Sequence, residues 1–268
     1  MRNTAPAVPI HAVPAADRRF GGLARLFGDA GLARLHAAHV IVIGIGGVGS
    51  WTAEALARSG VGHLTLIDLD HVSESNVNRQ IHALDSTLGA PKVKVMAERI
   101  GDYAVDCQVD VVEEFVTPEN VAALIGPADA VVDAIDQPRA KAALIALCRG
   151  SGHRLVVCGG AGGRTDPLRL KRDDLARTRG DALLSGVRAR LRREYGFARE
   201  AGKKFGIAAI YSDEPLPAGS PRGADNTGAP LNCAGYGSVV TVTAAMGLAA
   251  AQCAIDWIVR PPKGSTPR

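Results

Sequence analysis

Short apolar runs rich in β-branched residues alternate with longer amphipathic segments between positions 39 and 158. The first run, His39–Gly44, places alternating valine and isoleucine between a histidine and a glycine. Runs of this kind are typical of parallel strands buried on both faces, and the segments between them have the apolar spacing of helices. The alternation predicts the α/β class, with a doubly wound, mostly parallel, Rossmann-like sheet. Further strands are expected at 63–68, 108–112, 129–135, 154–158 and 206–211.

Helix-starting signals lie between these runs. Ser50–Ser59 has helical apolar spacing, and Pro91 opens a segment whose apolar face extends to Tyr103. Thr117-Pro118-Glu119 combines an N-cap residue, a first-turn proline and an acid, so we expect a helix from Thr117 to Ile125. A further helix is expected at 138–148.

The composition is that of a folded chain, because 47% of the 268 residues are hydrophobic and 22% are charged. This length suits one large domain or two small ones and excludes a fibrous or disordered class. The net charge of +4 neither requires nor excludes a nucleic-acid partner. The five cysteines are odd in number and lack C-x-x-C spacing, which argues against a disulfide framework and a four-cysteine zinc site. We therefore expect a cytoplasmic protein without zinc.

The chain is interpreted as a disordered tail followed by a single domain that ends in a C-terminal extension. Its parts are the tail at 1–17 and the domain at 18–268, made of a core at 18–163, a basic helical segment with a mobile loop at 164–235, and a long closing helix at 236–259. The closing helix is long enough to cross a bilayer. Because it contains much alanine together with Gln252 and Asp256, we expect a buried core or dimer-interface helix and no membrane span.

A glycine-rich turn follows the first predicted strand and opens a helix. Such a turn lets the backbone approach phosphate groups, which then meet the N-terminus of the helix. It is no Walker loop, because Ser50-Trp51 stands where Lys and Ser/Thr are needed. Asp68 ends the second strand, where a carboxylate can bind ribose hydroxyls, so an NAD-dependent dehydrogenase still fits. The glycines are Gly44, Gly46, Gly47 and Gly49.

The polar run after Asp68 favours a triphosphate over the pyrophosphate of NAD. Lys92 lies in the first turn of a predicted helix, where the dipole disfavours a cation unless a polyphosphate is near. Arg79 and Lys92 together suit a triphosphate. Asp133 and Asp136 end another strand at the same edge; Asp136 could hold Mg²⁺ against phosphate oxygens, whereas Asp133 is expected to be a structural strand-end carboxylate.

Taken together, these motifs resemble the ubiquitin-activating-enzyme-like adenylating family, which includes the sulfur-carrier activators. The shared pattern is G-x-G-G-x-G, then D-x-D-x-V-x-x-S-N-x-x-R-Q, then G-x-x-K and a later aspartate. The resemblance implies an Mg-ATP site in which Arg79, Lys92 and Asp136 are catalytic. It further implies Asp68 on the ribose and Asp136 on the metal. The remaining ATP-binding residues implied are Asp70, Asn76, Arg79, Gln80 and Lys92.

Within this family, one branch is more similar. The stretches 19–28, 78–84, 159–163 and 232–234 resemble the tRNA threonylcarbamoyladenosine dehydratases. That resemblance implies ATP-dependent cyclisation of the modified adenosine through a carboxyl-adenylate, with tRNA as partner. It also implies a homodimer in which Arg19 or Arg25 reaches the partner's ATP, and an association with cysteine-desulfurase systems. The alternative is adenylation of the C-terminus of a ubiquitin-like sulfur-carrier protein.

The segment 164–204 holds 13 Lys and Arg against 6 Asp and Glu, a local balance of +7. Its predicted helix has Leu184, Val187, Leu191 and Tyr195 on one face. For a tRNA-acting enzyme, the arginines on the rest of this helix form a phosphate-contacting surface; otherwise they form a solvated helix face. The arginines selected for tRNA contact are Arg188, Arg192 and Arg193.

Two residues keep alternative interpretations. Cys233 is either a thioester nucleophile, as in protein-activating relatives, or an incidental thiol. His82 lies in the stretch that matches the dehydratases, and we expect a packing or capping role for it. The remaining cysteines are expected in the core.

Overall fold

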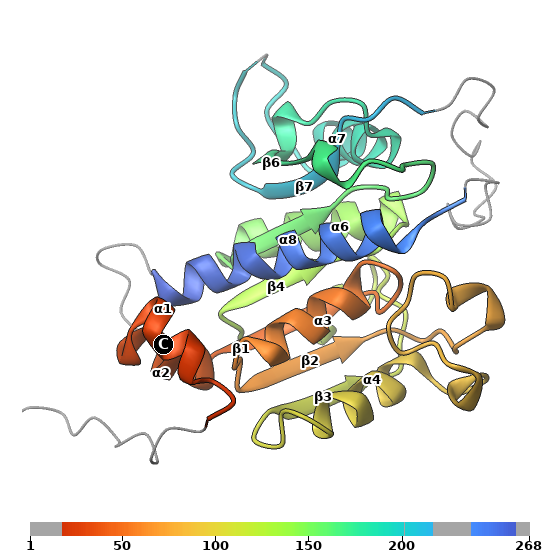
Figure 1. Cartoon of the computed structure of the whole chain (residues 1–268). Helices are drawn as coiled ribbons and strands as arrows, with labels where there is room; N and C mark the ends of the chain where they lie inside the picture. The colour runs from red at the N-terminus through yellow and green to blue at the C-terminus, as the bar shows by residue number, and fades with distance from the viewer. Residues whose placement is uncertain (1–17, 201, 217–236, 261–268) are drawn as a thin grey trace, which may run out of the picture.

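The computed structural model describes residues 18–200, 202–216 and 237–260. Seven strands form one sheet in the order β3-β2-β1-β4-β5-β7-β6, in which only β6 runs antiparallel to its neighbour (Figure 1). The predicted α/β class and the doubly wound, mostly parallel sheet are confirmed. The strands are β1 (His39–Ile43), β2 (His63–Ile67), β3 (Gln108–Val112), β4 (Ala130–Asp133), β5 (Leu155–Cys158), β6 (Leu170–Asp174) and β7 (Ala208–Ser212).

Helices cover both faces of this sheet, so each central strand is buried on both sides. The strand residues Val40 and Val42 join one core cluster with α3, α4 and α8, whereas Ile41 and Ile43 join another with α6 and α7. This is why the central strands are continuously apolar instead of alternating. The helices are α1 (Gly21–Phe27), α2 (Asp29–Ala37), α3 (Gly49–Arg58), α4 (Lys92–Gly101), α5 (Val121–Leu124), α6 (Pro138–Ser151), α7 (Ala182–Glu194) and α8 (Val240–Val259).

The closing helix α8 is a core helix, as one of the two sequence interpretations expected. In the described part of the chain it is long and apolar enough to cross a membrane, but 61% of its apolar window is buried inside the protein. It lies beside α3 in front of the sheet (Figure 1). A side chain at Gly247 would overlap the carbonyl oxygen of Val48, so glycine there permits the close approach of the two helices. The helix begins at Val240, later than the predicted residue 236.

The helix predicted from Thr117 to Ile125 is wrong in extent, because α5 covers only Val121–Leu124. Thr117 Oγ1 accepts from the backbone N–H of Glu119 and of Asn120, and Asn120 Oδ1 accepts in return from the Thr117 N–H. These local bonds form a turn that competes with the first helical turn. Thr117 therefore accepts the hydrogen bonds that an N-cap residue accepts, but these bonds close an isolated turn and start no helix.

Strand β6 was not predicted, and it lies inside the charged segment. It pairs only with β7 and exposes Lys171 and Arg172, which is typical of an edge strand protected by charge. Ser212, placed by the sequence in a mobile loop at 212–232, is instead the buried last residue of β7. The rest of that loop beyond residue 216, the tail at 1–17 and Cys233 lie outside the described residues.

Among the cysteines expected in the core, Cys148, Cys158 and Cys253 are buried and Cys107 is half-buried. Burial raises the pKa of the Cys253 thiol to about 11, which makes it a poor nucleophile at neutral pH. His82 is also buried, as a packing role requires.

Candidate active site

A cavity of about 380 Å³ opens at the carboxyl ends of the parallel strands. Its walls are the turns that follow β1, β2, β3, β4 and β5, joined by the start of α7 and residue Thr243 of α8. Strands β1 and β4 are neighbours in the sheet, but the helices that follow them, α3 and α6, cover opposite faces. The turns after β1 and β4 therefore diverge and leave a crevice between them. Ligands of open α/β sheets bind at such a crevice.

The four glycines of the loop have two different roles, one toward the cavity and one in the packing of the turn. Gly44, Gly46 and Gly47 line the cavity. Gly44 has a φ of +83°, in the left-handed region that favours glycine. A side chain at Gly49 would overlap the carbonyl oxygen of Gly44, so Gly49 is needed for the turn itself and does not line the cavity. Three glycines therefore face the cavity while the fourth lets α3 start against the loop.

Asp68 braces this loop from the end of β2. Its Oδ2 accepts from the Ile45 N–H at 2.6 Å and its Oδ1 from the Asp70 N–H at 2.9 Å. The carboxylate is buried and lines the cavity. Burial raises the pKa of Asp68, and the charge of Lys92 opposes that rise. The two backbone hydrogen bonds fix the orientation of the carboxylate. Its remaining lone pairs can therefore accept hydrogen bonds from ribose hydroxyls in a defined direction.

Lys92 and Asp70 form an ion pair at the cavity wall, with Nζ 2.8 Å from Oδ2. Lys92 is only 5% exposed, although it is the first residue of α4. A cation at this helix end is opposed by the dipole, so the carboxylate of Asp70 compensates it. The pair places a buried positive charge where a phosphate could share it.

Arg79 enters the same wall from the turn after the short 3₁₀ helix η1 (Glu74–Asn76). Its guanidinium donates to Ser75 O and to Asn78 Oδ1, and the indole N–H of Trp51 donates to its carbonyl oxygen. Burial lowers the pKa of Arg79 from its ordinary value. These bonds hold the side chain of Arg79 next to the glycine loop, where Gly47 packs against the Arg79 methylene groups.

Asn76 is not brought to the cavity wall. It is buried, and its Oδ1 accepts from the Ser73 N–H at 3.0 Å, so its side chain closes the η1 turn. Its neighbour Gln80 does line the cavity. Gln80 Oε1 is buried and accepts no hydrogen bond from the described residues.

Asp136 follows β4 and lines the cavity, half-buried. Burial raises its pKa, and the nearby charges of Asp70 and Asp68 raise it further. Carboxylate oxygens are ligands that Mg²⁺ prefers, and phosphate oxygens and water can complete its coordination. Asp136 therefore offers one such ligand, although no group of three potential metal-ligating side chains occurs among the described residues. Asp133 is different: it is fully buried and paired with Lys141, as expected of a structural carboxylate.

Several lining residues were missed by the sequence interpretation. Glu114–Thr117 follow β3 and could have been found, because carboxyl ends of parallel strands share one edge. Arg164 follows β5 and could have been found in the same way, whereas no local motif marks Asp181–Leu183, which lie further along the charged segment. Only the antiparallel return through β6 and β7 brings that segment beside β5.

The arginines proposed for other roles lie away from the cavity wall. Arg19 bonds Tyr103 O and Asp106, and Arg25 is exposed on α1, which leads through α2 to the amino end of β1 (Figure 1). Arg188 donates to Thr178 Oγ1, and Arg192 donates to Ala198 O and lies over the ring of Phe205. Of the three arginines selected for tRNA, only Arg193 is fully exposed, beside Glu194.

Comparison with known proteins places this architecture in context. Residues 21–267 match the ThiF family. The tRNA threonylcarbamoyladenosine dehydratase of Escherichia coli is 45% identical over 247 residues, which cover 89% of this chain and 92% of that protein. The enzyme of the same name from Haemophilus influenzae is 43% identical over 91% of this chain and 94% of its own length. The E. coli dehydratase structure in complex with ATP superposes with a TM-score of 0.83 over 92% of this chain and 97% of that chain, at 44% identity. Its AMP complex also gives 0.83, over 92% of this chain and 98% of that chain.

Proposed function

The chain belongs to the ThiF family and, within it, to the tRNA threonylcarbamoyladenosine dehydratases, and we propose that it catalyses the ATP-dependent dehydration of threonylcarbamoyladenosine in tRNA. The observation that carries the proposal is the near-full-length likeness to the E. coli dehydratase, which has been solved with ATP and with AMP. The cavity agrees with it, because its glycine loop, its buried Lys92 and the carboxylate of Asp68 suit a nucleoside triphosphate.

ATP would lie across the carboxyl ends of β2, β1 and β4. Asp68 binds the ribose hydroxyls, and the backbone of Gly46 and Gly47 approaches the phosphates. Lys92 and Arg79 contact the phosphate chain, where lysine acts as a point charge and arginine as a planar multi-donor group. The turn after β3, with Phe115 and Val116, supplies the apolar wall for the base.

The chemical step converts a poor electrophile into a reactive one. An oxygen of the threonine carboxylate bonds to the α-phosphorus of ATP, and the bond from that phosphorus to the bridging oxygen breaks, releasing pyrophosphate. Lys92 and Arg79 stabilise the charge that develops on the departing pyrophosphate. Asp136 would hold Mg²⁺, which neutralises phosphate charge when bound. The ion pair with Asp70 keeps Lys92 in place for this step.

Ring closure then occurs within the substrate. A nucleophilic atom of the ureido group attacks the acyl carbon, AMP leaves with the former carboxylate oxygen, and the ureido nitrogen loses a proton. Relative to the starting nucleoside, the product has lost one water. No enzyme nucleophile is required, so Cys233 has no part in this sequence, and the enzyme contributes mainly by positioning.

We also propose four further properties, which the resemblance, the cysteine pattern and the basic segment suggest. The enzyme acts as a homodimer in the cytoplasm, with Arg19 or Arg25 reaching the partner's ATP. Sulfur-transfer proteins of the cysteine-desulfurase type are partners, and exposed arginines around Arg193 contact tRNA phosphates. The expectation that the protein holds no zinc remains a prediction.

The test is to incubate the protein with ATP, Mg²⁺ and threonylcarbamoylated tRNA and to measure the nucleosides by mass spectrometry. Loss of one water from the modified adenosine, with stoichiometric AMP and pyrophosphate, supports the proposal. An unchanged nucleoside mass, together with ATP–pyrophosphate exchange driven by a ubiquitin-like carrier protein, would instead support adenylation of a protein C-terminus.

A further inference from the structure

The cavity extends beyond the part needed for ATP. The turns after β2 and β5 are separated by β1 and β4, so three strand spacings, roughly 14 Å, lie between them. The wall beyond β4 consists of Gly159–Gly162, Arg164 and Asp181–Leu183. None of these residues has a role in the ATP site described above.

Arg164 is a cationic group of this wall, and its hydrogen bonding is incomplete among the described residues. The residue is 3% exposed. Its Nη2 donates to Gly180 O at 2.6 Å, whereas its Nε and Nη1 are buried and have no partner among the described residues. Buried donors are rarely left unpaired in folded proteins, and for a guanidinium the cost is higher than for a neutral group. An acceptor is therefore missing at this position.

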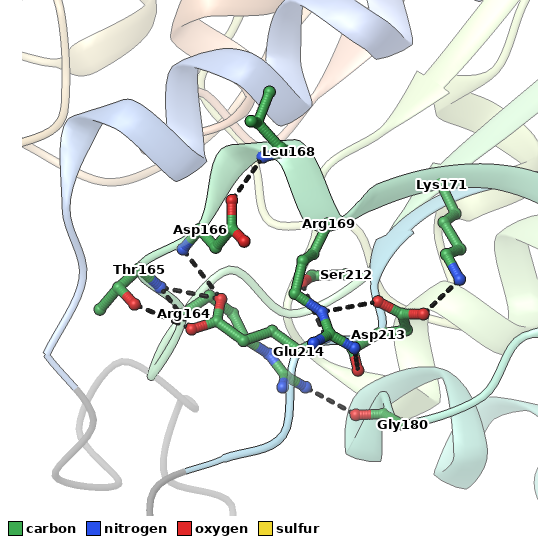
Figure 2. Close-up of polar contacts among 10 residues, drawn as sticks. All are labelled: Arg164, Thr165, Asp166, Leu168, Arg169, Lys171, Gly180, Ser212, Asp213 and Glu214. Atoms are coloured by element: carbon green, nitrogen blue, oxygen red, sulfur yellow. Dashed lines mark hydrogen bonds and ion pairs between the residues drawn. The ribbon is translucent and has the colours of Figure 1, made fainter.

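The two carboxylates nearest to Arg164 are engaged elsewhere. Glu214 accepts from the Thr165 N–H and hydroxyl and from the Asp166 N–H (Figure 2). Asp181 accepts from the Gly160 N–H at 2.9 Å and from the Leu184 N–H at 2.8 Å. Burial raises the pKa of Asp181, and the charge of Arg164 opposes that rise. Backbone hydrogen bonds lower the pKa of Glu214, and the charge of Arg164 adds to that lowering. Neither hydrogen-bond set includes the guanidinium of Arg164. Among the described residues no side chain supplies the acceptor, and a ligand in the cavity can supply it.

The first turn of α7 lies in the same cavity wall as Arg164. Asp181 is the N-cap of the 13-residue helix α7, and Ala182 and Leu183 of its first turn line the cavity. The N-terminus of a helix carries partial positive charge and favours negative groups. A side chain at Gly159 would overlap the carboxylate of Asp181, so the glycine lets Asp181 join the loop to the helix. The guanidinium and the helix end therefore belong to one fixed wall.

We propose that Arg164 binds the carboxylate of the threonylcarbamoyl group and directs it toward the α-phosphorus of ATP. This inference rests on the proposed function and deepens it by assigning the substrate end of the cavity. The reaction brings a second anion, the substrate carboxylate, close to the phosphates of ATP. This carboxylate must approach the α-phosphorus from the side opposite the departing pyrophosphate, so a cation is needed there to hold it. Arginine suits a carboxylate because its planar donors match the two oxygens.

The experiment compares Arg164→Gln with Arg172→Gln, an exposed arginine on edge strand β6 that pairs with Asp256. The first measurement is dehydration by the wild-type protein, whose failure would concern the proposed function alone. The second is binding of threonylcarbamoyladenosine nucleoside and of its methyl ester in the presence of a non-hydrolysable ATP analogue. We expect wild-type protein and Arg172→Gln to bind the acid at least 10-fold more tightly than the ester.

Arg164→Gln should lose this preference and reduce tRNA-dependent ATP–pyrophosphate exchange about 100-fold, while ATP affinity stays within twofold. The proposal would be overturned if Arg164→Gln still bound the acid more tightly than the ester. It would also be overturned if ATP affinity fell as much as affinity for the acid. If Arg164→Gln does not fold, Arg164→Lys replaces it, with a reduced but measurable acid preference expected. A wild-type protein that dehydrates tRNA yet binds acid and ester equally would also overturn it.

Discussion

Nζ of Lys141 lies 2.8 Å from Oδ1 of Asp133, and both side chains are completely buried. The pair joins α6 to the end of β4, three residues before Asp136. Lys141 also donates to the carbonyl oxygen of Asp133, and Oδ1 of Asp133 accepts from the Ile135 N–H. Burial raises the pKa of Asp133, and Lys141 opposes that rise. The ion pair therefore holds the turn that carries Asp136 into the cavity.

Breaking this pair should be costly because it leaves an uncompensated buried charge. Lys141→Met should lower the free energy of unfolding by about 3–5 kcal/mol, as measured by urea denaturation. The double variant Asp133→Asn with Lys141→Met should recover part of that loss, since no charge is then buried. Equal stability of the wild type and Lys141→Met would contradict the structural role.

Two glycines of the phosphate loop should respond differently to alanine. Gly49→Ala forces a methyl group against the Gly44 carbonyl oxygen, so we expect a large loss of thermal stability. Gly46→Ala has open space around its side chain, so the protein should fold normally. Because Gly46 lines the cavity, its methyl group should nevertheless weaken ATP binding, measured by calorimetry, at least 10-fold. Wild-type ATP affinity in Gly46→Ala would argue against phosphates at this loop.

The contribution of the Lys92 charge to catalysis can be measured by comparison with Lys94, which lies on the same helix α4. Lys92→Met removes a buried cation from the cavity and should reduce kcat/KM for dehydration by about 10²–10³-fold. Lys94 is exposed and pairs with Glu113 at the surface, so Lys94→Met should leave the rate near that of the wild type. Similar rates for the two variants would remove Lys92 from the mechanism.

His82 should make the fold sensitive to mild acid. Burial, together with the charges of Lys92 and Arg99, lowers its pKa from 6.5 to about 4. The folded state thus binds the proton less readily than the unfolded state, so stability falls as pH drops from 6.5 toward 4. The loss attributable to this residue should be about 2 kcal/mol at pH 5. Urea denaturation at pH 7 and pH 5 should show a smaller decrease in His82→Leu, whereas the exposed-site variant His71→Gln should behave as wild type.

The arginines of α7 should separate into structural and tRNA-facing groups. Arg188 bonds Thr178, so Arg188→Ala should lower thermal stability. Exposed Arg193 should instead affect tRNA: Arg193→Gln is expected to reduce the slope of log affinity against log salt by about 0.7–0.9. Arg139→Gln, which removes an exposed arginine of α6, serves as the control with an unchanged slope. An unchanged slope in Arg193→Gln would exclude this arginine from the tRNA surface.

The central strands and the glycine loop could be predicted because their signals are local. Runs such as His39–Gly44 predict strands that are buried on both faces. The turn after this strand needs glycine at position 44, where φ is +83°, and at position 49, where a side chain would overlap the Gly44 carbonyl oxygen. The side chains of Asp68, Lys92 and Asp136 then follow, since parallel strands end at one edge of the sheet. The same local reasoning failed at Thr117, where a cap signal closes a turn. Asn76, which the resemblance assigns to ATP, closes η1 with its amide, and its role toward ATP stays a prediction.

By itself, the sequence determined the α/β class, the family and the ATP-side half of the cavity. Only the tertiary structure decided that Asp181 of α7 joins Arg164 in the opposite wall and that Arg188 and Arg192 bond groups within the protein. The physical reason is that backbone periodicity and turn chemistry depend on neighbours in the chain. The wall beyond β4, in contrast, depends on the antiparallel return of β6 beside β7, a pairing between residues about 40 positions apart that no local pattern specifies.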